Sequence, residues 1–216
     1  GMYTHGVHDD YYMLRTKVPG GRLTPEQAEM VRGGRFLEER VKGHLPEGPI
    51  EGLGLIGYAM RDESQRAVRR EITDILIERL NTDRSAVKDV KISTIVALGL
   101  IPNDEDVILE VVDQTLMPLL INKRKEKNID LIRAHVPTAM MRMARHLKEN
   151  QETRTKWVTE FIKMIQNKKE DNFVRQSLVL ALGEMVTPAD KDLYDKAVDT
   201  LIYVQDNGRT EQERYF

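Results

Sequence analysis

The chain has no cysteine among its 216 residues. Disulfide bonds, thiolate metal sites, cysteine nucleophiles and cysteine-held iron–sulfur clusters are therefore excluded for this chain. Aromatic residues make up only 6% of it, which favours helices packed through aliphatic side chains over a β-sandwich. No stretch stays apolar for the ~20 residues that a membrane helix needs, so we expect no membrane insertion.

An excess of charge of one sign is also lacking. The chain has 33 basic and 35 acidic residues and a formal net charge of −2. It therefore has no net attraction for nucleic acid or for an anionic membrane, although local patches could still act. With 40% apolar and 31% charged residues, its composition is typical of a globular protein.

Three stretches of the chain align with one another without gaps. They begin at Val90, Ile132 and Val174, so each starts 42 residues after the one before. Each opens with a β-branched residue followed by a cation, and each has alanine seven residues after its start, at Ala97, Ala139 and Ala181. The chain therefore contains a repeat of fixed period.

A further step of 42 residues back from Ala97 leads to Leu55-Ile56-Gly57, which predicts a fourth, degenerate copy starting near Gly48. This triplet matches Ala97-Leu98-Gly99 and Ala181-Leu182-Gly183 in size and polarity. Helices that stack closely need small side chains where their backbones approach. We therefore expect the small residues of these triplets to form the contacts between neighbouring repeats.

A period of about 40 to 47 residues that carries two helices is typical of HEAT and armadillo repeats. The sequence resembles the HEAT family, whose pattern is a first helix, a polar turn, and a second helix opening Val-Arg and ending Ala-Leu. The match is best from Asp171 through Val174-Arg175 to Gly183, whereas Met141 replaces the glycine in the preceding copy. The resemblance covers roughly residues 25 to 206. It implies an all-α, right-handed α-α superhelix of about four two-helix repeats plus a terminal capping helix.

We expect three parts: an extended N-terminal segment (1–23), a HEAT-like repeat domain (24–206) and a tail (207–216). Within the repeat domain the patterns predict one helix over 104–121, kinked by Pro118, and one over 129–147 that contains Pro137. The last helix, from about 188 to 205, is expected to bury an apolar face that includes Ile202. Its other face is expected to be polar, as in a terminal cap.

Residues 12–27 (YMLRTKVPGGRLTPEQ) are typical of a short strand, a turn and a helix that begins at Pro25 with Thr24 as its N-cap. This run resembles the start of the ferredoxin-like half-domain of siroheme nitrite and sulfite reductases. In that family an arginine of the strand helps to hold the oxyanion, a role that falls by position to Arg15 or Lys17. The cysteines that hold the family's cluster are missing, so the resemblance implies an accessory element or a fusion relic without the active site.

The sequence offers one candidate metal site, formed by His5, His8 and Asp9. Imidazoles and carboxylates at this spacing can share a transition metal. The segment has no second shell to orient these ligands, so we predict that the chain holds no metal and no other cofactor. Phosphate-loop spacing and a nucleophile elbow are both missing from the sequence, and we expect no enzymatic activity.

Two basic clusters and a pair of methionines are the candidate partner-binding residues: Arg66, Arg69, Arg70, Lys123, Arg124, Lys125, Met141 and Met143. Acidic residues are interleaved with both clusters, which favours a solvated face of mixed charge over a nucleic-acid site. In the methionine group, Met140 aligns with core leucines, so only its neighbours at 141 and 143 could be exposed to a partner.

We therefore expect a non-catalytic scaffold that binds a protein partner of unknown identity. Two alternatives stay open: a nucleic-acid-binding HEAT-like module, which would bind duplex DNA in a salt-sensitive way, and an accessory element of a siroheme reductase, which would co-purify with that enzyme. The lack of an apolar signal segment favours the cytoplasm. Gly1 ahead of Met2 resembles the remnant of a cleaved tag, so a trimmed leader stays open as well.

Overall fold

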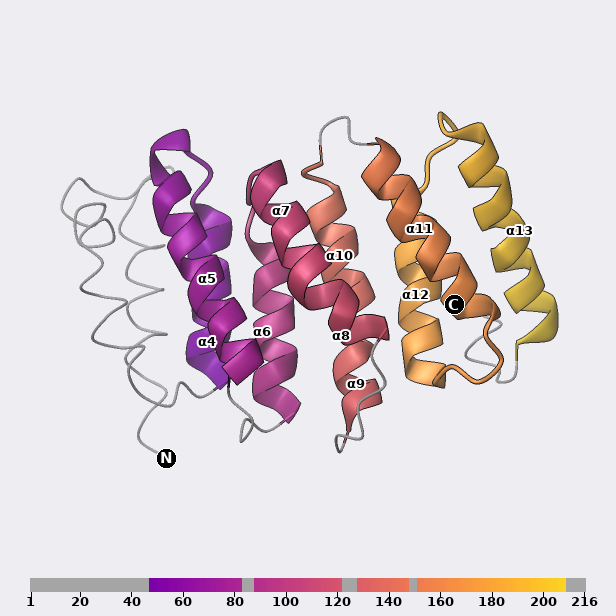
Figure 1. Ribbon diagram of the computed structural model, residues 1–216, viewed down its shortest axis with the longest axis horizontal. Helices are drawn as coiled ribbons and strands as arrows, with labels where there is room; N and C mark the ends of the chain where they lie inside the picture. Colours follow the sequence, from indigo (N-terminus) through magenta and orange to yellow (C-terminus); the bar gives the residue numbers. More distant parts are fainter. Residues whose placement is uncertain (1–46, 83–87, 122–127, 148–150, 209–216) are drawn as a thin grey trace. The chain divides into compact units, whose positions relative to one another are not determined.

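The computed structural model describes residues 47–82, 88–121, 128–147 and 151–208, which form helices and turns without a strand (Figure 1). No helix within these ranges is long and apolar enough to cross a membrane. The chain divides into two compact units, Gly1–Val107 and Ile108–Phe216, and each is described by itself. The expected strand before Pro19 and the helix that was predicted to begin at Pro25 lie outside the described residues.

The described part of the first unit packs three helices around one apolar core. These are α4 (Glu47–Ala59), α5 (Arg66–Thr82) and α6 (Lys88–Leu100). Each of the three contacts the other two. A single-turn 3-10 helix (Glu63–Gln65) leads into α5. The core is built from aliphatic side chains at helical spacing, among them Ile50, Val68, Ile72, Leu76, Ile95 and Leu98.

The closest approach in this unit is between α4 and α6. A Cβ atom on Gly54 would lie 2.7 Å from the Cα atom of Ala97, and a Cβ atom on Gly57 would lie 2.8 Å from Cγ1 of Ile101. Ala97 itself is fully buried. Small residues therefore set the distance between these two helices, which is the role expected for Ala97.

The second unit takes up the chain within α7 (Glu105–Val111), which crosses the boundary. A π-helical segment and six α-helices follow: Val112–Leu116, α8 (Met117–Ile121), α9 (Ile129–Arg133), α10 (Val136–Ala144), α11 (Gln151–Gln166), α12 (Asn172–Met185) and α13 (Lys191–Asn207). Helix α12 packs against both α10 and α11, and α13 packs mainly against α11. Trp157 and Phe161 of α11 are fully buried at the centre of this packing.

The two helices expected to contain a proline both depart from a regular α-helix. Residues 105–121 are helical without a gap, but they include a π-helical segment. The π-helical segment ends two residues before Pro118, which has no amide hydrogen to continue the helical hydrogen-bond pattern. The single helix expected over 129–147 is wrong, because the chain forms α9 and α10 with Pro137 in the first turn of α10. Proline is accepted in a first turn, where the amide donor is not needed, and disrupts the hydrogen bonding of a helix interior.

Helix α13 buries a stripe at spacings of four, three and four residues, formed by Leu193, Ala197, Thr200 and Val204. This stripe turns Ile202 to the opposite side, where its side chain is 51% exposed, so its expected burial is wrong. Lys191, Asp195 and Lys196 are exposed, and the exposed side of α13 also includes Ile202 and Tyr203.

Gly183 does not have the role expected for it. No atom of the described residues lies within 4 Å of a Cβ atom built on Gly183, and the residue is exposed. The expectation that it contacts a neighbouring repeat is therefore wrong within the described chain. Its counterpart in the first unit, Gly57, does make such a contact.

Buried arginines join consecutive helices by donating to carbonyl groups at helix ends. Nε of Arg133 donates to the carbonyl oxygen of Leu120 at 2.7 Å. Arg175, one period later, donates through Nε to the carbonyl oxygen of Ile165 at 3.1 Å. The last carbonyls of a helix have no donor within it, so these bonds satisfy groups that would otherwise be buried without a partner.

Arg133 is also the centre of a buried ion pair. Its Nη1 atom lies 2.9 Å from Oε1 of Glu170 and 2.6 Å from Oδ1 of Asp130. The side chains of Arg133 and Glu170 are 0% and 2% exposed. Burial lowers the pKa of Arg133, but the hydrogen bonds to Glu170 and Asp130 outweigh this effect and the pKa lies above its usual value. The guanidinium therefore stays charged in the core, and Glu170 is the buried group that neutralises it.

The two glycine environments predict opposite effects of the same substitution. Gly54→Ala should destabilise the fold by about 1–2 kcal/mol, because overpacking against Ala97 outweighs the better helix propensity of alanine. Gly183→Ala should stabilise it by about 0.5–1 kcal/mol, because the added methyl group meets nothing. Urea unfolding of dilute protein measures both, and effects of the same sign would contradict the packing described.

The buried ion pair predicts a large loss on removal of one partner. Glu170→Ala leaves the Arg133 charge buried and should lower the free energy of unfolding by about 3–5 kcal/mol. The matched control is Glu160→Ala, which removes a surface ion pair with Lys163 and should cost less than about 1 kcal/mol. Denaturant unfolding that finds equal losses would show that the buried pair is not stabilising.

Candidate interaction surface

The described basic cluster lies in the first turn of α5, next to the loop that follows α6. Asp62 caps the 3-10 helix that leads into α5. Its side chain accepts a hydrogen bond from the backbone nitrogen of Ser64 at 2.9 Å, and the side chain of Gln65 accepts one from the backbone nitrogen of Asp62 at 3.3 Å. This capping box fixes where the helical turn begins. It thereby fixes the directions in which Arg66 and the arginines after it point.

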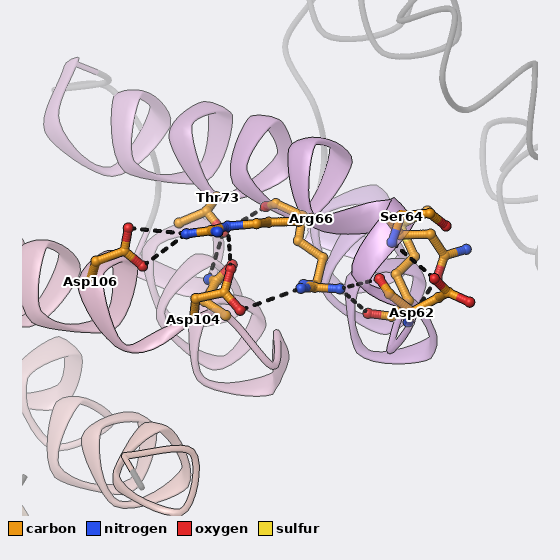
Figure 2. Close-up of polar contacts among 10 residues, drawn as sticks. Asp62, Ser64, Arg66, Thr73, Asp104 and Asp106 are labelled. Atoms are coloured by element: carbon orange, nitrogen blue, oxygen red, sulfur yellow. Dashed lines mark hydrogen bonds and ion pairs between the residues drawn. The ribbon is translucent and has the colours of Figure 1, made fainter. Parts of the chain in front are cut away.

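Arg66 forms ion pairs with two aspartates, Asp104 in the loop after α6 and Asp106 in the first turn of α7. Its Nε atom lies 2.6 Å from Oδ2 of Asp104, and its Nη2 atom lies 3.3 Å from Oδ2 of Asp106. Figure 2 shows the guanidinium between the two carboxylates. The Arg66 side chain remains 51% exposed, so this ion-pair group is formed at the surface.

A buried side-chain network holds this loop against α5. Nδ2 of Asn103 donates to the hydroxyl oxygen of Thr73 at 2.8 Å, and that hydroxyl donates to the carbonyl oxygen of Arg69 at 2.8 Å. Asn103 and Thr73 are both buried. The two aspartates that follow Asn103 are therefore positioned by a hydrogen-bond network in the core, and their ion pairs with Arg66 form on a fixed backbone.

Arg69, one of the expected partner-binding residues, is buried, with 4% of its side chain exposed. Its Nη1 atom donates to the carbonyl oxygens of Met60 at 3.1 Å and of Asp62 at 2.8 Å. Arg69 therefore supplies hydrogen-bond donors to backbone carbonyl groups just after the end of α4, as Arg133 does for a carbonyl group at the end of α8. Arg154, also the fourth residue of its helix, donates in the same way to the carbonyl oxygens of Ala144 and Leu147.

The residues around Arg66 line a shallow, open hollow of mixed charge. Its lining residues are Glu63, Ser64, Arg66, Ala67, Arg70, Asp106 and Val107. Nε of Arg70 lies 2.9 Å from Oδ1 of Asp74, one helical turn further on. Each arginine of the cluster is thus already bonded to carboxylates or carbonyls, which disfavours a phosphate site here. Fixed charges of both signs at an open surface suit polar and charged side chains of another protein.

The other candidate residues are either buried or outside the described ranges. Met141 and Met143 are 8% and 0% exposed, so the expectation that one of them is exposed to a partner is wrong. The second basic cluster, Lys123, Arg124 and Lys125, lies outside the described residues, as do His5, His8 and Asp9. Within the described part of the chain, no group of three or more His, Cys, Asp or Glu residues could hold a metal ion.

Sequence reasoning missed Asp104 and Asp106, which complete the surface around Arg66. Asp106 is 40 residues from Arg66, close to one period. The period itself was the available signal, because residues one repeat apart contact each other in stacked repeats. A search for acidic residues near that distance from each exposed arginine would have found both aspartates.

The contrast between Arg66 and Arg69 predicts different costs for the same substitution. Arg69→Met leaves two carbonyls without their donor and should lower the free energy of unfolding by about 2–3 kcal/mol. Arg66→Met removes only surface ion pairs and should cost less than about 1 kcal/mol. Denaturant unfolding of the two variants decides between these roles, and equal costs would contradict them.

Comparison with known proteins gives no match: no protein-family model, no curated protein and no solved structure is similar to this chain. A functional assignment therefore has to come from the residues of the chain itself. Two features bear on this assignment. One is the 42-residue period of the sequence, and the other is the surface around Arg66 that is formed by α5, the loop after α6 and the start of α7.

Proposed function

We propose that this chain is a non-catalytic protein-interaction scaffold, built from HEAT-like two-helix repeats that stack into a right-handed superhelix. In such a scaffold each repeat buries its apolar face against its neighbours, and the exposed side chains of successive helices form one extended surface. That surface selects a partner through shape and charge without changing it chemically.

Contacts between residues about one period apart support the stacking of repeats. In the first unit, the Ser93 hydroxyl donates to Oε1 of Glu51, 42 residues earlier. In the second unit, Arg145 and Glu184 form an ion pair at a separation of 39 residues. A repeating chain that stacks its units side by side makes this kind of contact again and again.

The observation that carries the proposal is the ion-pair group at the hollow of the first unit. Arg66 is held by two aspartates, and those aspartates are held by the buried Asn103 to Thr73 hydrogen bond. A preorganised polar group at an exposed surface can bind a partner without first paying the ordering entropy of its side chains. We therefore place the binding surface around this hollow.

Capture of partners from native lysate by the full chain tests this function. We expect a protein to be retained by the wild type, and Asp106→Ala and Arg70→Ala to reduce its amount by roughly fivefold each, as the loss of an interface contact worth about 1 kcal/mol would. Lys163→Ala, at an exposed position of α11 outside the hollow, is the matched control and should retain the partner as the wild type does.

Three outcomes would contradict the proposal at different levels. If no protein is retained above a bait-free resin, or if the purified chain alone turns over a small molecule, the scaffold function is wrong. If the partner is retained equally by the hollow variants and by the control, the scaffold stands and its binding surface is not at the hollow.

A further inference from the structure

The surface around the hollow has more negative than positive charge. Residues 61–74 and 103–107, which form it, include seven carboxylate side chains and four arginines. Arg66 and Arg70, the two arginines that line the hollow, are bonded to three carboxylates between them. A surplus of negative charge therefore remains after the ion pairs of the hollow are counted.

Two carboxylates of the hollow can still accept hydrogen bonds from outside the chain. Asp106 is 68% exposed, and its two contacts with Nη2 of Arg66 are long, at 3.3 and 3.4 Å. Glu63 is exposed and forms no ion pair or side-chain hydrogen bond with any residue that the structure describes. The guanidinium of Arg70, in contrast, lies against both carboxylate oxygens of Asp74 at 2.9 and 3.1 Å. The groups that remain open to a ligand are thus mainly acceptors, which need a donor with positive charge.

The shape of the hollow favours a chain segment over a small ligand or a metal ion. Sites for small molecules bury most of their ligand, whereas this hollow is shallow and open. Ala67 and Val107 supply an apolar part of its lining. Lysine and arginine side chains suit such a surface, because their methylene stems cover apolar atoms while their charged ends reach carboxylates.

We propose that the hollow binds a basic segment of the partner protein, whose lysine or arginine side chains bond to the carboxylates of Glu63 and Asp106. This inference rests on the scaffold function proposed above and specifies the chemistry of the partner. Both carboxylates stand on backbone that is held in place, Glu63 by the capping box of Asp62 and Asp106 by the buried Asn103 to Thr73 hydrogen bond that precedes it. The partner therefore meets acceptors whose backbone is ordered before binding.

NMR titration of the purified, isotope-labelled full chain with a capped hexa-arginine peptide tests this proposal. We expect weak binding at low salt, with a dissociation constant on the order of 0.1–1 mM. The largest changes in amide shifts should occur at residues 63–67 and 104–107. Raising the ionic strength from about 20 to 200 mM should weaken the binding at least roughly threefold, because exposed charges are screened. A capped hexaglutamate peptide should leave the same amides unchanged.

Single-charge variants assign the binding to the hollow. Asp106→Asn and Glu63→Gln should each weaken hexa-arginine binding roughly threefold, as the loss of one exposed charge contact would. Asp192→Asn is the matched control, since Asp192 is also an exposed carboxylate in the first turn of a helix but lies outside the hollow. This variant should bind hexa-arginine as the wild type does, which separates a specific site from a general effect of first-turn carboxylates.

Four results would overturn the proposal: no binding of hexa-arginine at low salt, shift changes spread over residues outside the hollow, hexaglutamate binding at the hollow, or equal binding by the hollow variants and a weakened control. Partner capture from lysate gives a separate answer. If a partner is retained but hexa-arginine does not bind, the scaffold function stands and its partner does not present a basic segment to the hollow. If hexa-arginine binds at the hollow and no protein is retained, the acidic site stands and the scaffold function is wrong.

Discussion

Carbonyl groups at the ends of packed helices need donors, and arginine side chains supply them in both units. Arg69 and Arg154 reach back from the first turn of a helix to the chain that leaves the previous helix. Arg133 of α9 donates to the end of α8, and Arg175 of α12 donates to the end of α11. Each bond thus connects the end of one helix to a later helix and satisfies a carbonyl group that has no donor within its own helix.

A buried arginine needs a counterion, and at Arg133 that counterion comes from a segment 37 residues later in the chain. Arg133 binds the end of α8 through Nε and binds Glu170, just before α12, through Nη1. The position of α12 relative to α8 thus depends on an ion pair whose two side chains are both buried. Because unpaired burial of either charge is costly, arrangements of these helices that separate Arg133 from Glu170 are disfavoured.

The period and the burial of its alanines could be predicted from the sequence, because equivalent residues of a repeat meet equivalent surroundings. Ala97, Ala139 and Ala181 are buried alike, at 0%, 2% and 0% exposure. Helix ends and ion-pair partners could not be predicted in the same way. The break before Pro137 depends on local hydrogen bonding that the repeat pattern does not contain. The burial of Arg69 had a usable signal, since it precedes Ile72 by three residues and therefore lies on the apolar side of α5.

The same residue type in the same register has different consequences along the chain. Gly57 touches the next helix, whereas Gly183, three periods later, faces open space. The sequence period places the same residue type at equivalent positions, but the neighbours of each position decide whether a close contact forms there. The exposed sides of α12 and α13 accordingly carry both kinds of residue, Phe173 with Glu184 on α12 and Ile202 with Lys191 on α13.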